Sequence, residues 1–344
     1  MTINHLHRIR NVVLAVLVIF TFVVTDLSVC AAKTTELQGV ALHRKGEQWK
    51  KWAWLSEEVA KKMAGEVKMK PTTTFEEIGL KGSEALRLLK AGIVDVTEVL
   101  PGYVGGDFPL IEATEFPGVD LSWEKRKEMF NNWTQNVIAP REDLMGGRII
   151  GTMCWNSILL FTKFPLNTID DLKGKKIRVF ATNQAQYLNS LGAEPVSMPI
   201  SEVYGALQRG IIDGVVTGPD QIGAMKLWEI TSNVIDFGFP PLGSYIVMSS
   251  RSWSKLSEEQ QKKMLEIGVD LTELAWKLGQ DNNRIGLDLA KENNMTIVPF
   301  NPEWRTQLRQ VLQDVIVPEW AKLVGDDGVA AFNKYLAPYV GFTK

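Results

Sequence analysis

An arginine stands inside a short apolar run of this chain, where Ile177 and Val179 flank Arg178. Burying a guanidinium without a negative partner is heavily penalised, so the side chain either meets an anion or lies on an exposed face. Its planar fork suits a carboxylate, which it can bind through two parallel hydrogen bonds. Spacing alone favours the alternative, an exposed basic strand face shared by Lys176 and Arg178.

Residues typical of catalysis or metal binding are scarce. Beyond residue 32, His43 is the one histidine, at the end of an expected strand, and no Gly-x-Ser-x-Gly elbow, Walker loop or Gly-x-Gly-x-x-Gly turn occurs. The acidic pairs Glu76-Glu77 and Asp326-Asp327 are adjacent in sequence, so we expect them to be solvated rather than to form an acid and base pair. We therefore expect no enzyme activity, no metal and no cofactor.

The first 32 residues have the pattern of a secretory signal. Basic residues precede the apolar run 12–24, and Ala31 and Ala32 are small enough for cleavage. The run is shorter than the ~20 residues that span a bilayer, which argues against the alternative of a signal anchor. Attachment of lipid to Cys30 is a lesser alternative, because the valine before it departs from the lipoprotein pattern. The sequence thus predicts an exported, periplasmic protein.

Charge and cysteine content narrow the class further. The formal net charge of the whole chain is −2, and it becomes −3 when Arg8, Arg10 and Asp26 leave with the signal. Such a charge implies no attraction to nucleic acid or to a membrane surface. Cys154 is then the remaining thiol and cannot form an internal disulfide. Roughly 310 residues exceed what one hydrophobic core usually organises, so we expect two lobes.

Two stretches, 88–102 and 206–220, repeat one pattern: a helix end, a glycine, a short apolar strand and a loop with proline. Ligands of open α/β sheets bind beyond the carboxyl ends of strands, so two such units would form a cleft between lobes. The whole chain alternates strand and helix patterns, which predicts an α/β fold with mostly parallel sheets. Expected strands are 36–43, 66–74, 93–99, 148–154, 176–180, 194–197 and 211–216, and expected helices are 47–64, 83–91, 184–191, 201–209, 302–317 and 329–336.

A longer helical pattern extends from Ser257 to about residue 293 and begins with a capping box. At 1.5 Å per residue an unbroken helix there would be roughly 50 Å long, so we expect it to lie across both lobes. Glycines at 268, 279 and 286 each weaken it by about 1 kcal/mol relative to alanine. Two helices broken near Gly279 are therefore the alternative.

Three blocks, 170–179, 191–199 and 202–214, together resemble the solute-binding proteins of tripartite ATP-independent periplasmic (TRAP) transporters. They begin Asp-Asp-Leu-Lys-Gly, Leu-Gly-Ala-Glu-Pro and Glu-Val-Tyr-Gly-Ala, and occur in the order and spacing of that family. The resemblance covers roughly residues 36–300. It implies a periplasmic-binding-protein-like fold that closes around a small organic acid and delivers it to TRAP membrane permease subunits. We expect lobe I to comprise 33–150 plus 243–283, and lobe II 151–242 plus 284–344.

The resemblance places the carboxylate-binding arginine of the family on Arg178. Thr217 stands where many members have asparagine, and Phe164 stands where many have a basic residue before proline. Both departures remove a polar contact, which disfavours sialic acid-like or multi-anionic ligands and favours a monocarboxylate. Around Arg178 we expect a ligand site at strand ends: Tyr103, Trp155, Asn156, Phe180, Thr217 and Tyr245.

Alternatives remain open for these residues and for the function. The aromatic side chains are more often core than ligand wall. Asp95 and Asp213, which match in the repeated pattern, are expected to be structural turn or cap carboxylates. A secreted enzyme that acts on a small acid, or a ligand-sensing input protein for a membrane kinase, could use the same cleft.

Overall fold

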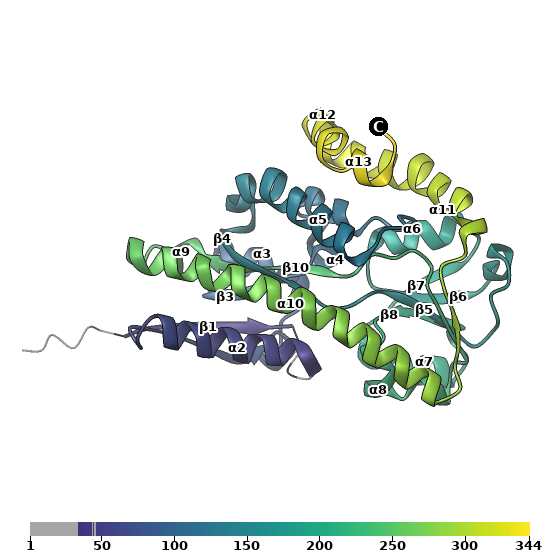
Figure 1. Ribbon diagram of the computed structural model, residues 1–344, viewed down its shortest axis with the longest axis horizontal. Helices are drawn as coiled ribbons and strands as arrows, with labels where there is room; N and C mark the ends of the chain where they lie inside the picture. Colours follow the sequence, from purple (N-terminus) through teal and green to yellow (C-terminus); the bar gives the residue numbers. More distant parts are fainter. Residues whose placement is uncertain (1–33, 43, 45) are drawn as a thin grey trace, which may run out of the picture. The chain divides into compact units, whose positions relative to one another are not determined.

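Two β-sheets organise the part of the chain that the computed structural model describes, residues 34–42, 44 and 46–344. Residues 36–344 form one compact unit. The strands of the first sheet are β1 (Thr35–Ala41), β2 (Val67–Thr74), β3 (Val96–Val99), β4 (Gly147–Cys154) and β10 (Gly243–Ser249); those of the second are β5 (Leu159–Thr162), β6 (Lys176–Val179), β7 (Glu194–Ser197), β8 (Gly214–Thr217), β9 (Asn233–Ile235) and β11 (Thr296–Val298). Their order is β2-β1-β3-β10-β4 and β11-β9-β5-β8-β6-β7. Figure 1 labels most of these strands.

Each sheet contains a strand that runs antiparallel to both of its neighbours. These strands are β10, between β3 and β4, and β5, between β8 and β9. The predicted strands are all present, but β5, β9, β10 and β11 were not predicted. β5 and β10 are buried along their whole length, so they lack the alternation that marks a half-exposed strand.

Two of the connections between the sheets are short segments that pair with each other; the third is through α10 (Glu258–Glu292) to β11. Residues 155–158 lead from β4 to β5, and residues 236–242 return from β9 to β10. The backbone N–H of Trp155 donates to the carbonyl of Leu242 at 2.9 Å, and the N–H of Leu242 donates to the carbonyl of Asn156 at 3.0 Å. Short paired crossovers of this kind can act as a hinge between two lobes.

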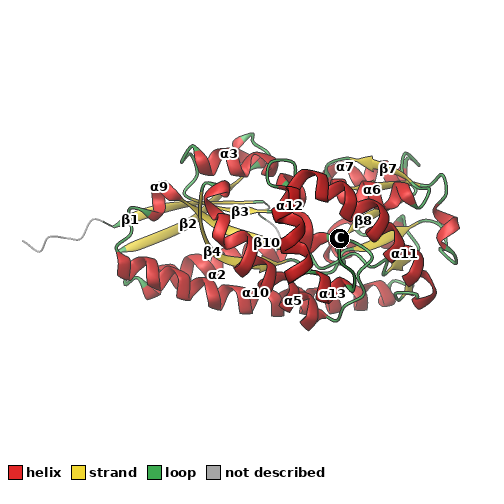
Figure 2. Ribbon diagram, turned by 90° about the horizontal axis from the view of Figure 1, so that it is seen from above, coloured by secondary structure: helices red, strands yellow, loops and turns green. Residues whose placement is uncertain are grey.

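The long helix α10 (Glu258–Glu292) is unbroken and contacts β4 of the first sheet and β11 of the second. Figures 1 and 2 show it passing the strands of both sheets. The alternative of two helices is wrong, because the glycines serve close packing. A Cβ on Gly268 would lie 1.4 Å from the carbonyl oxygen of Ile150, and one on Gly286 would lie 2.5 Å from that of Pro219. The helix thus approaches backbone in both lobes.

Helices cover the faces of both sheets. α2 packs on β2 and on α10, whereas α8 packs on the other end of α10. The predicted helices over 47–64, 83–91, 184–191 and 201–209 are confirmed as α2, α3, α6 and α7. Besides α10, the helices are α2 (Gly46–Lys62), α3 (Ala85–Lys90), α4 (Pro101–Val104), α5 (Trp123–Trp133), α6 (Thr182–Ser190), α7 (Ile200–Gln208), α8 (Asp220–Met225), α9 (Ser250–Trp253), α11 (Arg305–Val311), α12 (Val317–Tyr335) and α13 (Ala337–Val340).

The C-terminal helix α12 packs on α5 and on the 3₁₀ segment Pro109–Glu115. Phe116 and Trp320 meet edge to face with ring centroids 5.5 Å apart, and the indole N–H of Trp320 donates to the carbonyl of Pro109 at 2.8 Å. The end of the chain therefore packs on the region that follows β3. β4 continues in the first sheet to Cys154, past the residue 150 at which we expected lobe I to end.

Three predictions fall on residues outside the described part of the chain: the signal over 1–32, lipid attachment at Cys30, and His43 at the end of a strand. Within the described residues, none of the helices combines the length and the apolar composition that a membrane crossing requires.

Candidate functional site

A cavity of about 850 Å³ lies where strand ends from both sheets meet the crossover segments and α10. Its size falls in the range of small-molecule sites. Leu42 and Leu100 follow strands of the first sheet, and Phe180 and Thr217 lie at strand ends of the second. The crossovers contribute Trp155, Asn156, Ile158 and Leu242, and α10 contributes Asn282, Ile285, Gly286 and Leu289.

Arg178 reaches this cavity from the middle of β6. The strand is exposed at Lys176 and buried over the next three residues, and Arg178 is only 4% exposed. Its Nε donates to the carbonyl of Met198 at 3.0 Å, and its Nη1 donates to the carbonyl of Val216 at 3.1 Å. The alternative of an exposed basic strand face is therefore wrong.

The guanidinium of Arg178 lacks a carboxylate partner among the described residues. Burial lowers its pKa to about 10, a value at which it is still protonated near neutral pH. The ring of Phe180 lies 5.4 Å from the guanidinium carbon. Tyr103 of α4, in the first lobe, lies near the same cation. Burial raises the pKa of its phenol, and the positive charge of Arg178 opposes that rise. A buried cation in this setting favours an anionic guest.

The buried carboxyl of Glu98 accepts a hydrogen bond from Trp155, a residue of the cavity wall. The indole N–H of Trp155 donates to Oε1 of Glu98 at 2.8 Å, and Nε2 of Gln48 donates to the same oxygen at 3.3 Å. Burial raises the pKa of Glu98. Glu98 and Gln48 were not predicted as site residues, although Glu98 stands within an apolar strand just as Arg178 does. The same argument about a charge inside a strand would have found it.

Six of the seven expected ligand residues line the cavity: Tyr103, Trp155, Asn156, Arg178, Phe180 and Thr217. Tyr245 lies elsewhere. It is buried in the middle of β10, its ring stacks on Phe130 at 5.3 Å, and its hydroxyl lies 3.3 Å from that of Thr134. The residue belongs to the core because β10 is a central strand, and Tyr245 does not lie at its carboxyl end.

The two matched aspartates have the structural roles that we expected. Asp213 accepts a hydrogen bond from the N–H of Lys176 at 2.9 Å, and Asp95 accepts one from the N–H of Gln38 at 2.9 Å. Neither lines the cavity. The repeated pattern therefore fixes two equivalent strand junctions, one in each sheet.

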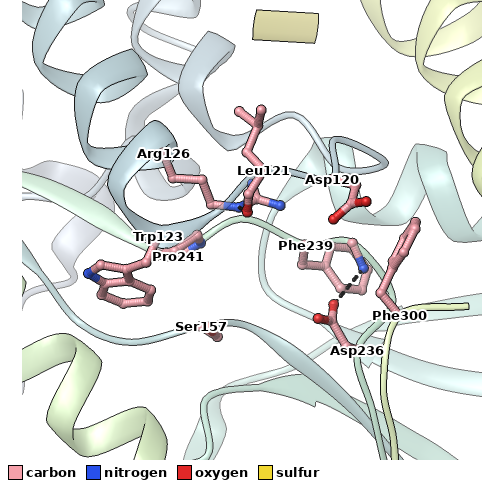
Figure 3. Close-up of a pocket in the computed structure, with 10 residues that line it drawn as sticks. Asp120, Leu121, Trp123, Arg126, Ser157, Asp236, Phe239, Pro241 and Phe300 are labelled. Carbon is pink, nitrogen blue, oxygen red and sulfur yellow. Dashed lines mark hydrogen bonds between the residues drawn. The ribbon is translucent and has the colours of Figure 1, made fainter. Parts of the chain in front are cut away.

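A second, smaller cavity of about 140 Å³ adjoins the crossover 236–242 (Figure 3). Figure 3 shows Arg126, Asp120 and Asp236 around it. Arg126 is 7% exposed, donates to the carbonyls of Val119 and Leu121, and has its pKa lowered to about 10 by burial. The charges of Asp236 and Asp120 oppose that fall in the arginine pKa, although neither carboxylate forms an ion pair with Arg126 in the described structure. Among the described residues no group of three His, Cys, Asp or Glu side chains could hold a metal ion.

A family model described as "Bacterial extracellular solute-binding protein, family 7" matches residues 40–322. The chain belongs to this family. The family match confirms the resemblance that we drew from the three sequence blocks, and it establishes an extracytoplasmic solute receptor with two α/β lobes.

Relatives and solved structures agree with this assignment. The chain is 30% identical to the sialic acid-binding periplasmic protein SiaP of Vibrio cholerae over 189 residues, 53% of this chain and 59% of SiaP. It is 24% identical to the C4-dicarboxylate-binding periplasmic protein DctP of Rhodobacter capsulatus over 261 residues, 73% of this chain and 76% of DctP. The crystal structure of DctP7 of Bordetella pertussis, an extracytoplasmic solute receptor binding pyroglutamic acid, superimposes with a TM-score of 0.80 at 23% identity, covering 88% and 99% of the two chains.

Proposed function

We propose that this protein captures a small monocarboxylate between its two lobes, with Arg178 as the carboxylate anchor, and delivers it to TRAP membrane permease subunits. One observation carries the proposal: a buried guanidinium, without an ionic partner in the described chain, faces a cavity of ligand size. A carboxylate would supply the missing negative charge and accept two parallel N–H bonds.

The rest of the cavity supports a ligand with an apolar or modestly polar body. Tyr103, Trp155 and Phe180 provide aromatic surface beside the anchor, and Thr217 provides a hydroxyl where many relatives have an amide. Sialic acid, C4-dicarboxylates and pyroglutamic acid, the ligands named for the relatives, all carry a carboxylate. The family resemblance also disfavours a multi-anionic ligand, because Phe164 stands where many members have a basic residue; Phe164 itself does not line the cavity.

Ligand entry would draw the lobes together about the paired crossovers and α10, without a chemical step. The moving bodies in this proposal are residues 33–150 with 243–283, and residues 151–242 with 284–344, with two changes that the packing requires. The end of β4, to Cys154, and helix α12 move with the first body, because β4 belongs to the first sheet and α12 packs on α5 and on Pro109–Glu115. A ligand shifts the open and closed populations only by its differential affinity for the closed form. Contacts from both lobes to one ligand, Tyr103 from the first and Arg178 from the second, would supply that difference.

Binding of organic acids to the purified protein, by thermal shift and then by calorimetry, tests the proposal. Arg178→Met should weaken binding of the best acid by about 2–5 kcal/mol, the range for removing one partner of a buried charge pair. Arg209→Met removes an exposed arginine of the same lobe and should leave affinity unchanged. An Arg178→Met variant that binds this acid as tightly as the parent would show that the anchor is wrong.

The proposal also holds that the ligand leaves unchanged. After prolonged incubation with the protein, mass spectrometry should recover the bound acid intact. Recovery of a product would favour the enzyme alternative instead. Transport in vesicles that contain the permease subunits should require the added receptor and should fail with Arg178→Met.

A further inference from the structure

The charged side chains of the ligand cavity are unevenly distributed. Five described lining residues carry charge: Arg44, Glu76, Glu77, Arg178 and Asp220. Arg44 and Glu77 pair with each other, Nε to Oε1 at 2.5 Å and Nη2 to Oε2 at 2.6 Å. Glu76 is exposed. The interior charges left for a ligand are therefore one guanidinium, Arg178, and one carboxylate, Asp220.

Asp220 is held in place by two amides. Nδ2 of Asn156 donates to Oδ1 at 2.6 Å, and Nε2 of Gln221 donates to Oδ2 at 2.6 Å. Gly218 leaves room for this arrangement, since a Cβ there would lie 2.3 Å from Oδ1 of Asn156 and 2.5 Å from Oδ1 of Asp220. An ionised carboxylate offers about four acceptor positions, so two remain for another donor.

Arg178 and Asp220 do not neutralise each other. Arg178 lies on β6, and Asp220 is the first residue of α8, which follows the neighbouring parallel strand β8. Nevertheless no ion pair joins them, and Asp220 has no Lys or Arg partner within 4.0 Å among the described residues. The cavity thus presents a guanidinium, Arg178, and a carboxylate, Asp220, that both line it and are not paired with each other.

We propose that Asp220 determines which acids this receptor accepts: a ligand with a single carboxylate and, at its other end, an N–H or O–H donor for Asp220. This inference rests on the proposed function and names its ligand class. Such a ligand would satisfy both fixed charges at once. A dicarboxylate would place its second anion near Asp220, where like charges repel; of the described lining residues the other cation is Arg44, which pairs with Glu77.

Sets of three acids that share one carbon skeleton provide the test. Each set contains a plain monocarboxylate, the same acid with a hydroxyl or amino group at the far end, and the corresponding dicarboxylate; phenylacetate, 3-hydroxyphenylacetate and 3-carboxyphenylacetate form one set. Calorimetry compares the parent with Asp220→Asn. Asp327→Asn, which removes one negative charge from exposed surface on α12, is the matched control.

In every set that binds, the donor-bearing acid should bind the parent most tightly. Asp220→Asn should lower the affinity for that acid at least tenfold and raise the affinity for the dicarboxylate. Asp327→Asn should change neither affinity. Should the amide variant fail to fold, Asp220→Ser replaces it with the same expectations. Equal affinity of parent and variant for the donor-bearing acid, or a dicarboxylate as the best parent ligand, overturns the inference and leaves the proposed function standing. If none of the acids binds the parent measurably, the proposed function itself is overturned.

Discussion

Trp155 and Glu98 join the ligand cavity to the core of the first sheet: the indole N–H of Trp155 donates to Oε1 of Glu98 across 2.8 Å. Oε1 also accepts from Ser244 and Gln48, whereas Oε2 has no hydrogen-bond partner in the described structure. Burial raises the pKa of this carboxyl, and the hydrogen bonds from Ser244 and Trp155 and the charge of Lys51 oppose that rise. Glu98 is therefore a positioning residue for the cavity wall.

Replacement of Glu98 should depend on whether an acceptor is kept. Glu98→Gln preserves an oxygen for the three donors and should cost about 1 kcal/mol of unfolding free energy or less. Glu98→Ala leaves three buried donors unsatisfied and should cost about 3 kcal/mol or more. Urea unfolding measures both. Equal stability of Glu98→Ala and the parent would contradict the role.

Cys154 should be unreactive in the native protein. The thiol is fully buried and its pKa is raised to about 12 by desolvation, so the nucleophilic thiolate is scarce at about pH 8. With Cys30 replaced by serine, a thiol reagent should label the chain only after unfolding. A Ser254→Cys variant in this background adds an exposed thiol and should react at once. Native labelling of Cys154 at the rate of residue 254 would contradict the burial.

Gly268 should tolerate no side chain. A Cβ there would lie 1.4 Å from the carbonyl oxygen of Ile150, which belongs to β4 and cannot move without disturbing the first sheet. Gly268→Ala should therefore destabilise the protein by about 3 kcal/mol or prevent folding, in line with overpacking of a rigid core. Gly106→Ala is the control, because a Cβ at 106 meets no atom within 4 Å. A Gly268→Ala variant with the parent's melting temperature would show that α10 is free to shift.

Local pattern predicted strands where a helix end and a glycine precede them: β3 and β8 were predicted although all of their residues are buried, whereas the equally buried β5 and β10 follow no such signal. The capping box at Ser257 and the amphipathic run behind it predicted α10, but periodicity could not show that Gly268 and Gly286 permit contact with backbone. β10 was not predicted: its seven residues are all buried, so they show no alternation, and a loop rather than a helix precedes the strand.

Only some of the residues that line the cavity could be predicted from the sequence. Arg178 drew attention as a charge inside an apolar run, but spacing alone favoured an exposed face, and the family resemblance was what placed it in the site. Asp220 and Gln48 were missed because a polar residue next to a loop or on a helix is ordinary in sequence, and only the tertiary fold brings it to the cavity. Tyr245 was misplaced since its strand was not recognised.

Glu112 should make the stability of the protein depend on pH. The side chain lies against Gly105, where a Cβ would come within 2.1 Å of Oε1, and burial raises its pKa from 4.5 to about 7. Nearby Glu115 has its pKa raised in the same direction, by burial and by the charge of Glu112. Between about pH 4.5 and 7 the folded state holds more protons than the unfolded state. The contribution of Glu112 to the free energy of unfolding is therefore fully present below pH 4.5 and is lost as the pH rises through 7.

Glu112→Gln should remove this dependence. The shift of Glu112 corresponds to about 3 kcal/mol of unfolding free energy between the two ends of the window. The variant should match the parent at about pH 4.5, exceed its stability by up to about 3 kcal/mol at about pH 8, and show a flatter profile in urea unfolding. Glu292→Gln, an exposed position at the end of α10, should keep the parent's slope. The opposite result would contradict this prediction: the parent becomes more stable from pH 4.5 to 7, and Glu112→Gln abolishes that increase. It would mean that the carboxylate is ionised in the folded state beside an unrecognised cation.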